Sequence, residues 1–492
     1  MDIYELLDEE QRYQLFIVRL LDLTIDEYIS ISKLEELTGQ STFKIKKYIH
    51  NINYDLHNNG FDSKVIVQDD VVQLQDIDLK VIKLLQIHYF ETSHIFPLMI
   101  YLLEGQGTID GYAQEHFLST SKAYAARKQL ITFFKPLGIK IKKGKFAGDE
   151  LMIRNSISTI IFEALNGYYC PFSDSINQAA KKVIEFLTFH FDLRLTPTQK
   201  GKLKVLTALS LVRCKNDRSL DDSFLSSNKV FQTAELNQLS AYIQVDSDKL
   251  VDELSYLLMF LYVEGLLRKA DEIDFKFDYF ATIDTKSQQI SNQILHQVEE
   301  KYQIQLPEEI RHSYRQRVRQ SNRRHAIYSF YTSSFSTNKQ IQSVNEVYPV
   351  YSEIIWGVIK EHLPKEQQDL NGQMVRFFYD YLFILLDILP PEQVEKPIDV
   401  FVDFSQGKEY TKFIIKQIEG FKDLNLAIGD RLTSHTEILV SNCVVPRFKG
   451  KQIVWKNPPA PSDWEVFGDS IVQVKKERLL NRDMKRLEDT GE

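Results

Sequence analysis

The chain has 492 residues, which is too many for one hydrophobic core and predicts roughly three to five domains. Hydrophobic residues make up 43% and charged residues 26%, ordinary globular proportions that argue against long disordered regions. The net charge of -8 argues against nucleic-acid binding by the molecule as a whole. A local basic face remains compatible with it, because affinity depends on charges near the phosphates.

The three cysteines, Cys170, Cys214 and Cys443, lie far apart and form no CxxC pair. The sequence therefore predicts neither a zinc ribbon nor a disulfide framework, and it suits a reducing cytosol. No apolar run approaches the roughly 20 residues that span a bilayer, and the acidic start differs from a signal peptide. We expect a cytoplasmic protein with no membrane partner.

Helical periodicity with few breaks by glycine or proline predicts a mainly α, multidomain protein. Residues 1–60 are expected to be helical, and a β-hairpin joined at Asp69-Asp70 follows them. Residues 79–135 are expected to be helical again, before a β-rich unit at 139–154.

An all-helical middle is expected from about residue 156 to residue 392. After Pro397, short apolar runs alternate with a helix, as in a small α/β domain with a mostly parallel sheet. The runs are 399–404, 425–428, 437–440 and 452–455, with the helix at 410–421. A charged helix is expected after Asp469.

Residues 31–57 predict two helices around a tight turn at 38–40, with Ser41 as the N-cap of the second helix. Its buried face repeats Ile45, Ile49, Ile52 and Leu56. The other side, which suits the major groove, offers the candidate DNA contacts Lys44, Lys46, Lys47 and Asn51. A solvated amphipathic helix explains the same pattern, and Asp69-Asp70 argue against phosphate contact at the hairpin tip.

A second helix-turn-helix is expected at 108–134, with Ile109, Ala113 and Phe117 on the buried side of its first helix. The second helix is expected at 122–134, capped by Ser119 or Ser121. Its apolar face comprises Ala123, Ala126, Leu130, Ile131 and Phe134. A basic β-segment follows at 139–145. The candidate DNA contacts of this unit are Ser119, Ser121, Lys122, Tyr124, Arg127, Lys128, Lys140, Lys142, Lys143 and Lys145.

Residues 119–145 contain eight basic residues and no Asp or Glu. Such a concentration in an acidic protein indicates phosphate binding, because a solvated surface usually mixes both signs of charge. An ordinary solvated surface is the alternative interpretation of this segment.

The sequence at 116–154 reads HFLSTSKAYAARKQLITFFKPLGIKIKKGKFAGDELMIR. It resembles the second helix-turn-helix of the Mga/RofA-like transcription regulators. The matching positions are Phe117, Leu118, Ser119, Ser121, Tyr124, Arg127, Gly148, Glu150, Ile153 and Arg154. The resemblance is weaker but collinear over the rest of the chain.

The resemblance implies two winged helix-turn-helix domains, two helical domains like phosphotransferase-system regulation domains, and a domain like a phosphotransferase IIB component. The expected domains, in that order, are 1–76, 77–156, 157–280, 281–394 and 395–492. Members of this family are stand-alone regulators of Gram-positive cocci that often control virulence genes and dimerise. Several of them bind DNA with little base specificity.

Regulation domains of that type carry phosphate-accepting histidines, and the resemblance places Leu206, Phe260 and Arg319 at those positions. Arg213 matches the arginine that follows such a histidine. The candidate phosphorylation sites are therefore other histidines: His190, His312 and His325. A structural role between Phe189 and Phe191 is the alternative for His190.

The IIB-like domain has Asp403-Phe404-Ser405 where the resemblance implies a phosphocysteine, and Cys443 follows a later strand. Phosphotransfer by this domain is therefore not expected. Six arginines lie within 311–324 with no acid among them. They are compatible with binding of a phosphate, a phosphorylated effector or DNA. The favoured alternative is a helix face paired to acids from neighbouring segments, such as Glu308 and Glu309.

No catalytic constellation, metal-ligand cluster or nucleotide-binding loop occurs in the sequence, so we expect no enzyme and no cofactor. The sequence favours a transcription regulator, a global or virulence-gene activator, that binds double-stranded DNA with little sequence preference through both winged units. The expected partners are DNA, a second copy of the chain, RNA polymerase at promoters and the phosphocarrier protein HPr. The alternative is a phosphotransferase-linked sensory protein whose helix-turn-helix units contact proteins. That alternative leaves the basic residues of 119–145 unexplained.

Overall fold

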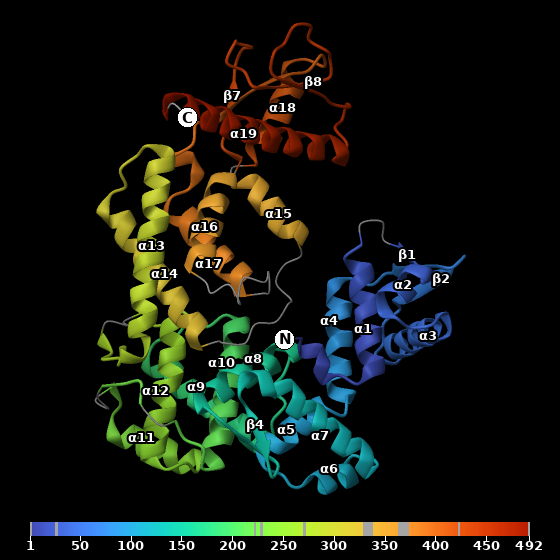
Figure 1. Ribbon diagram of the computed structural model, residues 1–492, viewed down its shortest axis with the longest axis vertical. Helices are drawn as coiled ribbons and strands as arrows, with labels where there is room; N and C mark the ends of the chain where they lie inside the picture. Colours follow the sequence, from blue (N-terminus) through green and yellow to red (C-terminus); the bar gives the residue numbers. More distant parts are fainter. Residues whose placement is uncertain are drawn as a thin grey trace. The chain divides into compact units, whose positions relative to one another are not determined.

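The computed structural model describes residues 2–24, 28–220, 223–226, 230–268, 272–327, 338–362, 373–421 and 424–490. Over these residues the protein is mainly helical with small sheets, as the sequence predicts (Figure 1). It divides into two compact units, Met1–Ala281 with Arg323–Thr332 and Thr282–Asn322 with Ser333–Glu492. The finer division into five domains stays a prediction. Within the described residues, no helix has the length and apolarity needed to cross a bilayer.

The first unit begins with helices around a three-stranded antiparallel sheet in the order β1-β3-β2. Its elements are η1 Ile3–Leu6, α1 Glu9–Asp22, β1 Tyr28–Ser30, α2 Ile31–Thr38, α3 Thr42–Asn58, β2 Lys64–Gln68 and β3 Val71–Gln75. The prediction that residues 1–60 are entirely helical is wrong at β1. Ile29 of β1 is buried and lies opposite Val72 of β3, so pairing with a distant strand overrides the local helical pattern.

The next elements carry the second helix-turn-helix. They are α4 Leu79–Thr92, α5 Phe96–Glu104, α6 Ile109–Glu115, α7 Thr120–Phe134, η2 Lys135–Leu137, β4 Lys140–Lys142, β5 Lys145–Ala147 and α8 Glu150–Leu165. The β-rich unit expected at 139–154 therefore ends at Ala147. Helix α8 begins directly afterwards, because the Asp149 carboxylate accepts a hydrogen bond of 2.7 Å from the Met152 N–H and caps it.

The rest of the first unit is a helical bundle centred on α10. Its elements are α9 Asp174–His190, α10 Pro197–Lys215, α11 Thr233–Ile243, α12 Ser247–Val263 and η5 Asp278–Phe280. Helix α10 contacts α8, α9 and α12, and most of its side chains from Leu203 to Cys214 are buried. The helix that follows the second helix-turn-helix is thus part of this bundle.

The second unit contains a helical bundle with its own core. Its elements are α13 Ala281–Tyr302, α14 Glu308–Ile327, α15 Asn338–Val347, α16 Pro349–His362, α17 Gln373–Ile388 and η8 Pro391–Gln393. Side chains from four of these helices meet in the core, among them Leu295, Tyr314, Ile355 and Phe378. This bundle precedes the α/β part of the same unit.

The α/β part has a parallel sheet in the order β7-β6-β8-β9. Its elements are β6 Ile398–Asp403, α18 Lys408–Glu419, β7 Leu426–Gly429, β8 Ile438–Ser441, β9 Lys451–Val454 and α19 Pro461–Thr490. The predicted strand runs all contain strands, and the sheet is parallel throughout. Helix α19 begins at Pro461, before the expected start, because Phe467 and Ile471 are buried in the core of this part.

Candidate nucleic-acid interface

Two helix-turn-helix units in the first unit of the chain follow the same backbone path. In the first, α2 and α3 flank a turn in which Gly39 has φ 64° and Ser41 is the N-cap of α3. In the second, α6 and α7 flank a turn in which Phe117 has φ 53° and Ser119 is the N-cap of α7. Each positive-φ residue lies two positions before its cap. Each unit continues into an antiparallel hairpin with a two-residue turn at positive φ.

Helix α3 buries the face that its sequence predicts. The buried residues are Ile45, Tyr48, Ile49, Ile52 and Leu56. The Asn53 side chain fixes the following hairpin to this helix through two hydrogen bonds. Its amide N–H donates one of 2.9 Å to the Val65 carbonyl, and its amide oxygen accepts one of 2.7 Å from the Val65 N–H. The hairpin is therefore held at one end of α3.

The candidate contacts on α3 have partners within the first unit. The Lys46 ammonium lies 3.6 Å from the Asp70 carboxylate at the hairpin tip, and that of Lys47 lies 2.6 Å from Glu10. The Lys44 ammonium donates a hydrogen bond of 2.9 Å to the side-chain oxygen of Gln40. Asn51 is half-buried. The positive charge of this surface is thus partly balanced by carboxylates.

The buried face of α7 differs at one position from the face that the sequence predicts. Ala123, Ala126 and Leu130 are buried as expected, but Phe133 takes the place of Ile131, which is only half-buried. The Ser119 hydroxyl accepts a hydrogen bond of 3.3 Å from the Lys122 N–H. Ser119 is therefore the cap, the helix starts at Thr120, and Ser121 is exposed on its first turn.

Phe117 lies outside the core, although the sequence pattern places it on the buried side of the preceding helix. Helix α6 ends at Glu115, and the chain then turns through the left-handed region at Phe117. This turn leaves the Phe117 side chain 97% exposed. Ile109 and Ala113 are buried as predicted, and Tyr112 is the third buried residue of α6, at 1% exposure.

The eight basic residues of 119–145 project from one module. Arg127 is half-buried and the others are exposed. Over the residues that the structure describes, no carboxylate lies within ion-pair distance of any of them. Lys122 makes one polar side-chain contact, 2.9 Å from its ammonium to the His94 ring. Tyr124 adds an aromatic ring, 45% exposed, to the same helix.

The β4–β5 hairpin presents the lysines that follow α7. Ile141 and Phe146 point inward and are buried, whereas Lys140, Lys142 and Lys145 are exposed. Lys143 forms the exposed turn with Gly144. The rings of Phe134 and Phe146 meet edge to face at 5.3 Å, so the hairpin is packed against the end of α7. Helix and hairpin thus form one basic surface element.

Residues 80–159 match the family model of the Mga helix-turn-helix domain. The match runs from α4 into α8 and includes α6, α7 and the β4–β5 hairpin. It supports the resemblance to the Mga family over this part of the chain and indicates a DNA-binding regulator. No curated protein matches the chain.

A buried ionic network joins the Mga-like module to the helical bundle behind it. Arg154 of α8 has no exposed side-chain surface, and its guanidinium contacts Glu150 at 2.9 Å and both carboxylate oxygens of Glu253 on α12. Arg213 of α10 lies 2.7 Å from the Glu150 carboxylate and donates a hydrogen bond of 3.3 Å to the Phe146 carbonyl on β5. The network therefore connects β5, α8, α10 and α12 through hydrogen bonds and ion pairs.

Burial raises the pKa of the Glu253 carboxyl, and the guanidinium of Arg154 opposes that rise. Arg213, which the resemblance relates to phosphate chemistry, is 3% exposed and already paired with a carboxylate. Sequence reasoning named Glu150, Arg154 and Arg213 separately but missed the network and Glu253. The available signal was the pair of carboxylates, Asp252 and Glu253, in the otherwise apolar run 250–263.

The candidate phosphorylation sites lie in different surroundings. His190 is half-buried, with one ring nitrogen 3.0 Å from the Val230 carbonyl and the other 3.6 Å from the Glu235 carboxylate. His312 is exposed on α14, and His325 on the same helix is buried. Phosphorylation at any of the three stays a prediction.

Three of the six arginines of α14 pair with acids in the described part of the chain. Arg311 contacts Glu299, Arg315 lies 2.8 Å from Glu308, and Arg317 lies 2.5 Å from Asp387. Arg323 is buried and lies over the Phe277 ring at 4.0 Å. These contacts favour the paired helix face over a phosphate-binding cluster.

Proposed function

We propose that the protein is a transcription regulator that binds double-stranded DNA with little sequence preference. In this proposal α7 enters the major groove and the β4–β5 hairpin contacts the flanking phosphates. The α2–α3 unit contributes a second, weaker contact. The protein acts as a homodimer at promoters, where it meets RNA polymerase.

The observation that carries the proposal is the basic surface of α7 and the β4–β5 hairpin, which has no carboxylate within ion-pair distance in the described part of the chain. Lysine and arginine side chains that are not neutralised by acids can release counterions from DNA phosphates when they bind. The exposed N-terminal turn of α7 adds N–H groups and a favourable dipole for a phosphate. Lysine–phosphate contacts position a protein without reading bases, which accounts for the proposed tolerance of sequence.

The test is binding of the full chain to two short duplexes of unrelated sequence, measured by fluorescence anisotropy at several salt concentrations. We expect similar Kd values for the two duplexes. We also expect log K to fall linearly with log salt, with a slope of about -0.9 for each phosphate contact. A tenfold or larger preference for one duplex would replace sequence tolerance with specific recognition. Absence of binding at low salt would contradict DNA binding itself and favour helix-turn-helix units that contact proteins.

A further inference from the structure

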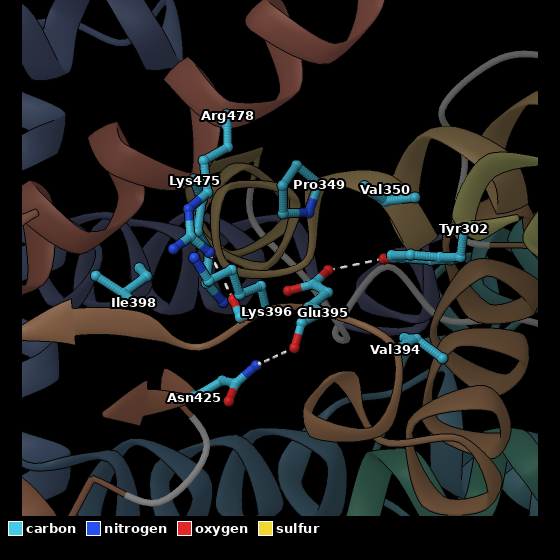
Figure 2. A pocket seen from close by; sticks show the side chains of 10 residues that line it. All are labelled: Tyr302, Pro349, Val350, Val394, Glu395, Lys396, Ile398, Asn425, Lys475 and Arg478. Carbon is cyan, nitrogen blue, oxygen red and sulfur yellow. Dashed lines mark hydrogen bonds between the residues drawn. The ribbon is translucent and has the colours of Figure 1, made fainter. Parts of the chain in front are cut away.

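A cavity of about 250 Å³ lies in the second unit, between the helical bundle and the α/β part (Figure 2). Its apolar wall includes Pro349, Val350 and Ile398. Lys475 and Arg478 reach it from α19, on the side opposite Tyr302 and Val350. The cavity therefore combines an apolar surface with basic groups, as small-molecule sites usually do.

Lys475 is the most informative residue of this cavity. It is only 7% exposed, and its ammonium donates a hydrogen bond of 3.1 Å to the Val347 carbonyl. In the described part of the chain, no carboxylate lies within ion-pair distance of this ammonium. Burial lowers the pKa of Lys475, and the carboxylates of Glu395 and Glu392 oppose that change without forming an ion pair with the ammonium. A buried ammonium in this state is costly and would be stabilised by an anion.

The other charged groups of the cavity compensate that positive charge only in part. Lys396 is exposed and forms no ion pair with a described residue. Arg478 is paired with Glu437, outside the cavity lining, and donates 2.8 Å to the Pro397 carbonyl. The one carboxylate among the described lining residues, Glu395, accepts a hydrogen bond of 2.7 Å from the Tyr302 hydroxyl. Two lysines thus face a cavity with one described carboxylate, Glu395, which does not lie within ion-pair distance of either ammonium.

We propose that this cavity binds a small organic anion. Its carboxylate or phosphate pairs with Lys475 and Lys396, and its short carbon skeleton lies against Pro349, Val350 and Ile398. The volume restricts the ligand to a small metabolite. The lining comes from α13, α16, β6 and α19, so the ligand stabilises the contact between the helical bundle and the α/β part. The site is an effector site and does not depend on DNA binding.

The test is isothermal titration calorimetry on the full chain with three probes at constant ionic strength: glycerol 3-phosphate, butyrate and inorganic phosphate. We expect saturable binding of glycerol 3-phosphate or butyrate with a millimolar or lower Kd, and weaker binding of inorganic phosphate, which lacks a carbon skeleton. The tighter of the first two probes tells phosphate from carboxylate. Lys475→Met keeps the buried methylenes and removes the charge, so Kd should rise at least about tenfold.

Two further variants complete the test. Lys396→Gln changes an exposed side chain, leaves the fold intact and should raise Kd about threefold. Lys476→Gln removes a charge from the same helix outside the cavity lining and should leave Kd unchanged. Absence of saturable binding by all three probes overturns the proposal. An unchanged Kd in both Lys475→Met and Lys396→Gln also overturns it.

Discussion

The two helix-turn-helix units share a backbone but differ in charge. Both have a left-handed residue two positions before a serine cap, and both continue into a hairpin with a tight positive-φ turn. The first hairpin ends in Asp69-Asp70, and Asp70 lies 3.6 Å from Lys46 of α3. The second ends in Lys143-Gly144 and follows a helix whose basic residues have no described carboxylate nearby. Apolar spacing thus specifies the same fold twice, whereas the placement of charge differs between the two helix-turn-helix units.

The two helix-turn-helices also differ in how they are attached to the rest of the compact unit that contains them. The α3 surface contacts its surroundings through exposed pairs such as Lys47–Glu10. The second helix-turn-helix is joined to the helical bundle through buried charges on Arg154, Glu253 and Arg213. Exposed pairs contribute little to stability, whereas breaking a buried pair is costly. The position of the second helix-turn-helix therefore depends on the bundle behind it.

The largest expected effect comes from breaking that attachment. Arg154→Met leaves Glu253 buried without a guanidinium and leaves Glu150 paired with Arg213 alone, so it should lower the local free energy of unfolding by about 3–5 kcal/mol. The measurement is native-state hydrogen exchange of α8 and the β4–β5 hairpin. The control is Arg268→Met, which breaks an exposed pair with Asp192 and should cost about 1 kcal/mol or less. Equal losses in the two variants would remove the distinction between the attachments.

The next effect concerns affinity for DNA. Replacing Lys122, Arg127 and Lys128 of α7 with Ala should weaken binding to every duplex at least about tenfold. The salt slope should become shallower by about one unit for each phosphate that the variant no longer neutralises. The matched variant replaces Lys44, Lys46 and Lys47 of α3 and should cost about threefold or less, because two of these lysines already pair with acids. The reverse order of losses would make the first helix-turn-helix the principal DNA contact.

A smaller effect should follow from removing acid at the first hairpin tip. Asp69→Asn with Asp70→Asn takes away two negative charges and frees Lys46, so affinity for DNA should rise about threefold at low salt. Asparagine tolerates the positive φ of both positions, so the turn is kept. Asp76→Asn, a change at another positive-φ aspartate, is the control and should alter affinity less. A gain that persists at high salt would not be electrostatic and would contradict this explanation.

The sequence predicted what depends on neighbours along the chain. Ile45, Ile49 and Ile52 are buried because helical spacing alone puts them on one face. The α/β strands were predicted because each is a short apolar run between polar loops. Glu253 was missed because its partner Arg154 is 99 residues away, and such a pair leaves no periodic signal. Phe117 was placed in the core because spacing does not show that α6 ends before it.

Phe117 supplies the smallest and sharpest comparison. The equivalent position of the first turn holds Gly39, which adopts positive φ without strain. Phe117 adopts the same backbone with a bulky side chain that is 97% exposed, so it accepts strain without gaining burial. Phe117→Asn should therefore raise the free energy of unfolding by about 0.5 kcal/mol. Gly39→Ala should lower it by a similar amount, because open space around Gly39 leaves only the backbone cost.

Chemical denaturation monitored by hydrogen exchange of the α6–α7 and α2–α3 segments measures both changes, and anisotropy measures DNA binding in the same variants. We infer that the strained, exposed ring of Phe117 contacts DNA when the protein binds it. Phe117→Asn should thus stabilise the free protein while weakening DNA binding about threefold, because the apolar ring no longer packs against the duplex. Gly39→Ala should leave binding unchanged. If Phe117→Asn destabilises the fold, the explanation that Phe117 strains the backbone at this turn is wrong. If it stabilises the fold with unchanged affinity, Phe117 does not touch DNA.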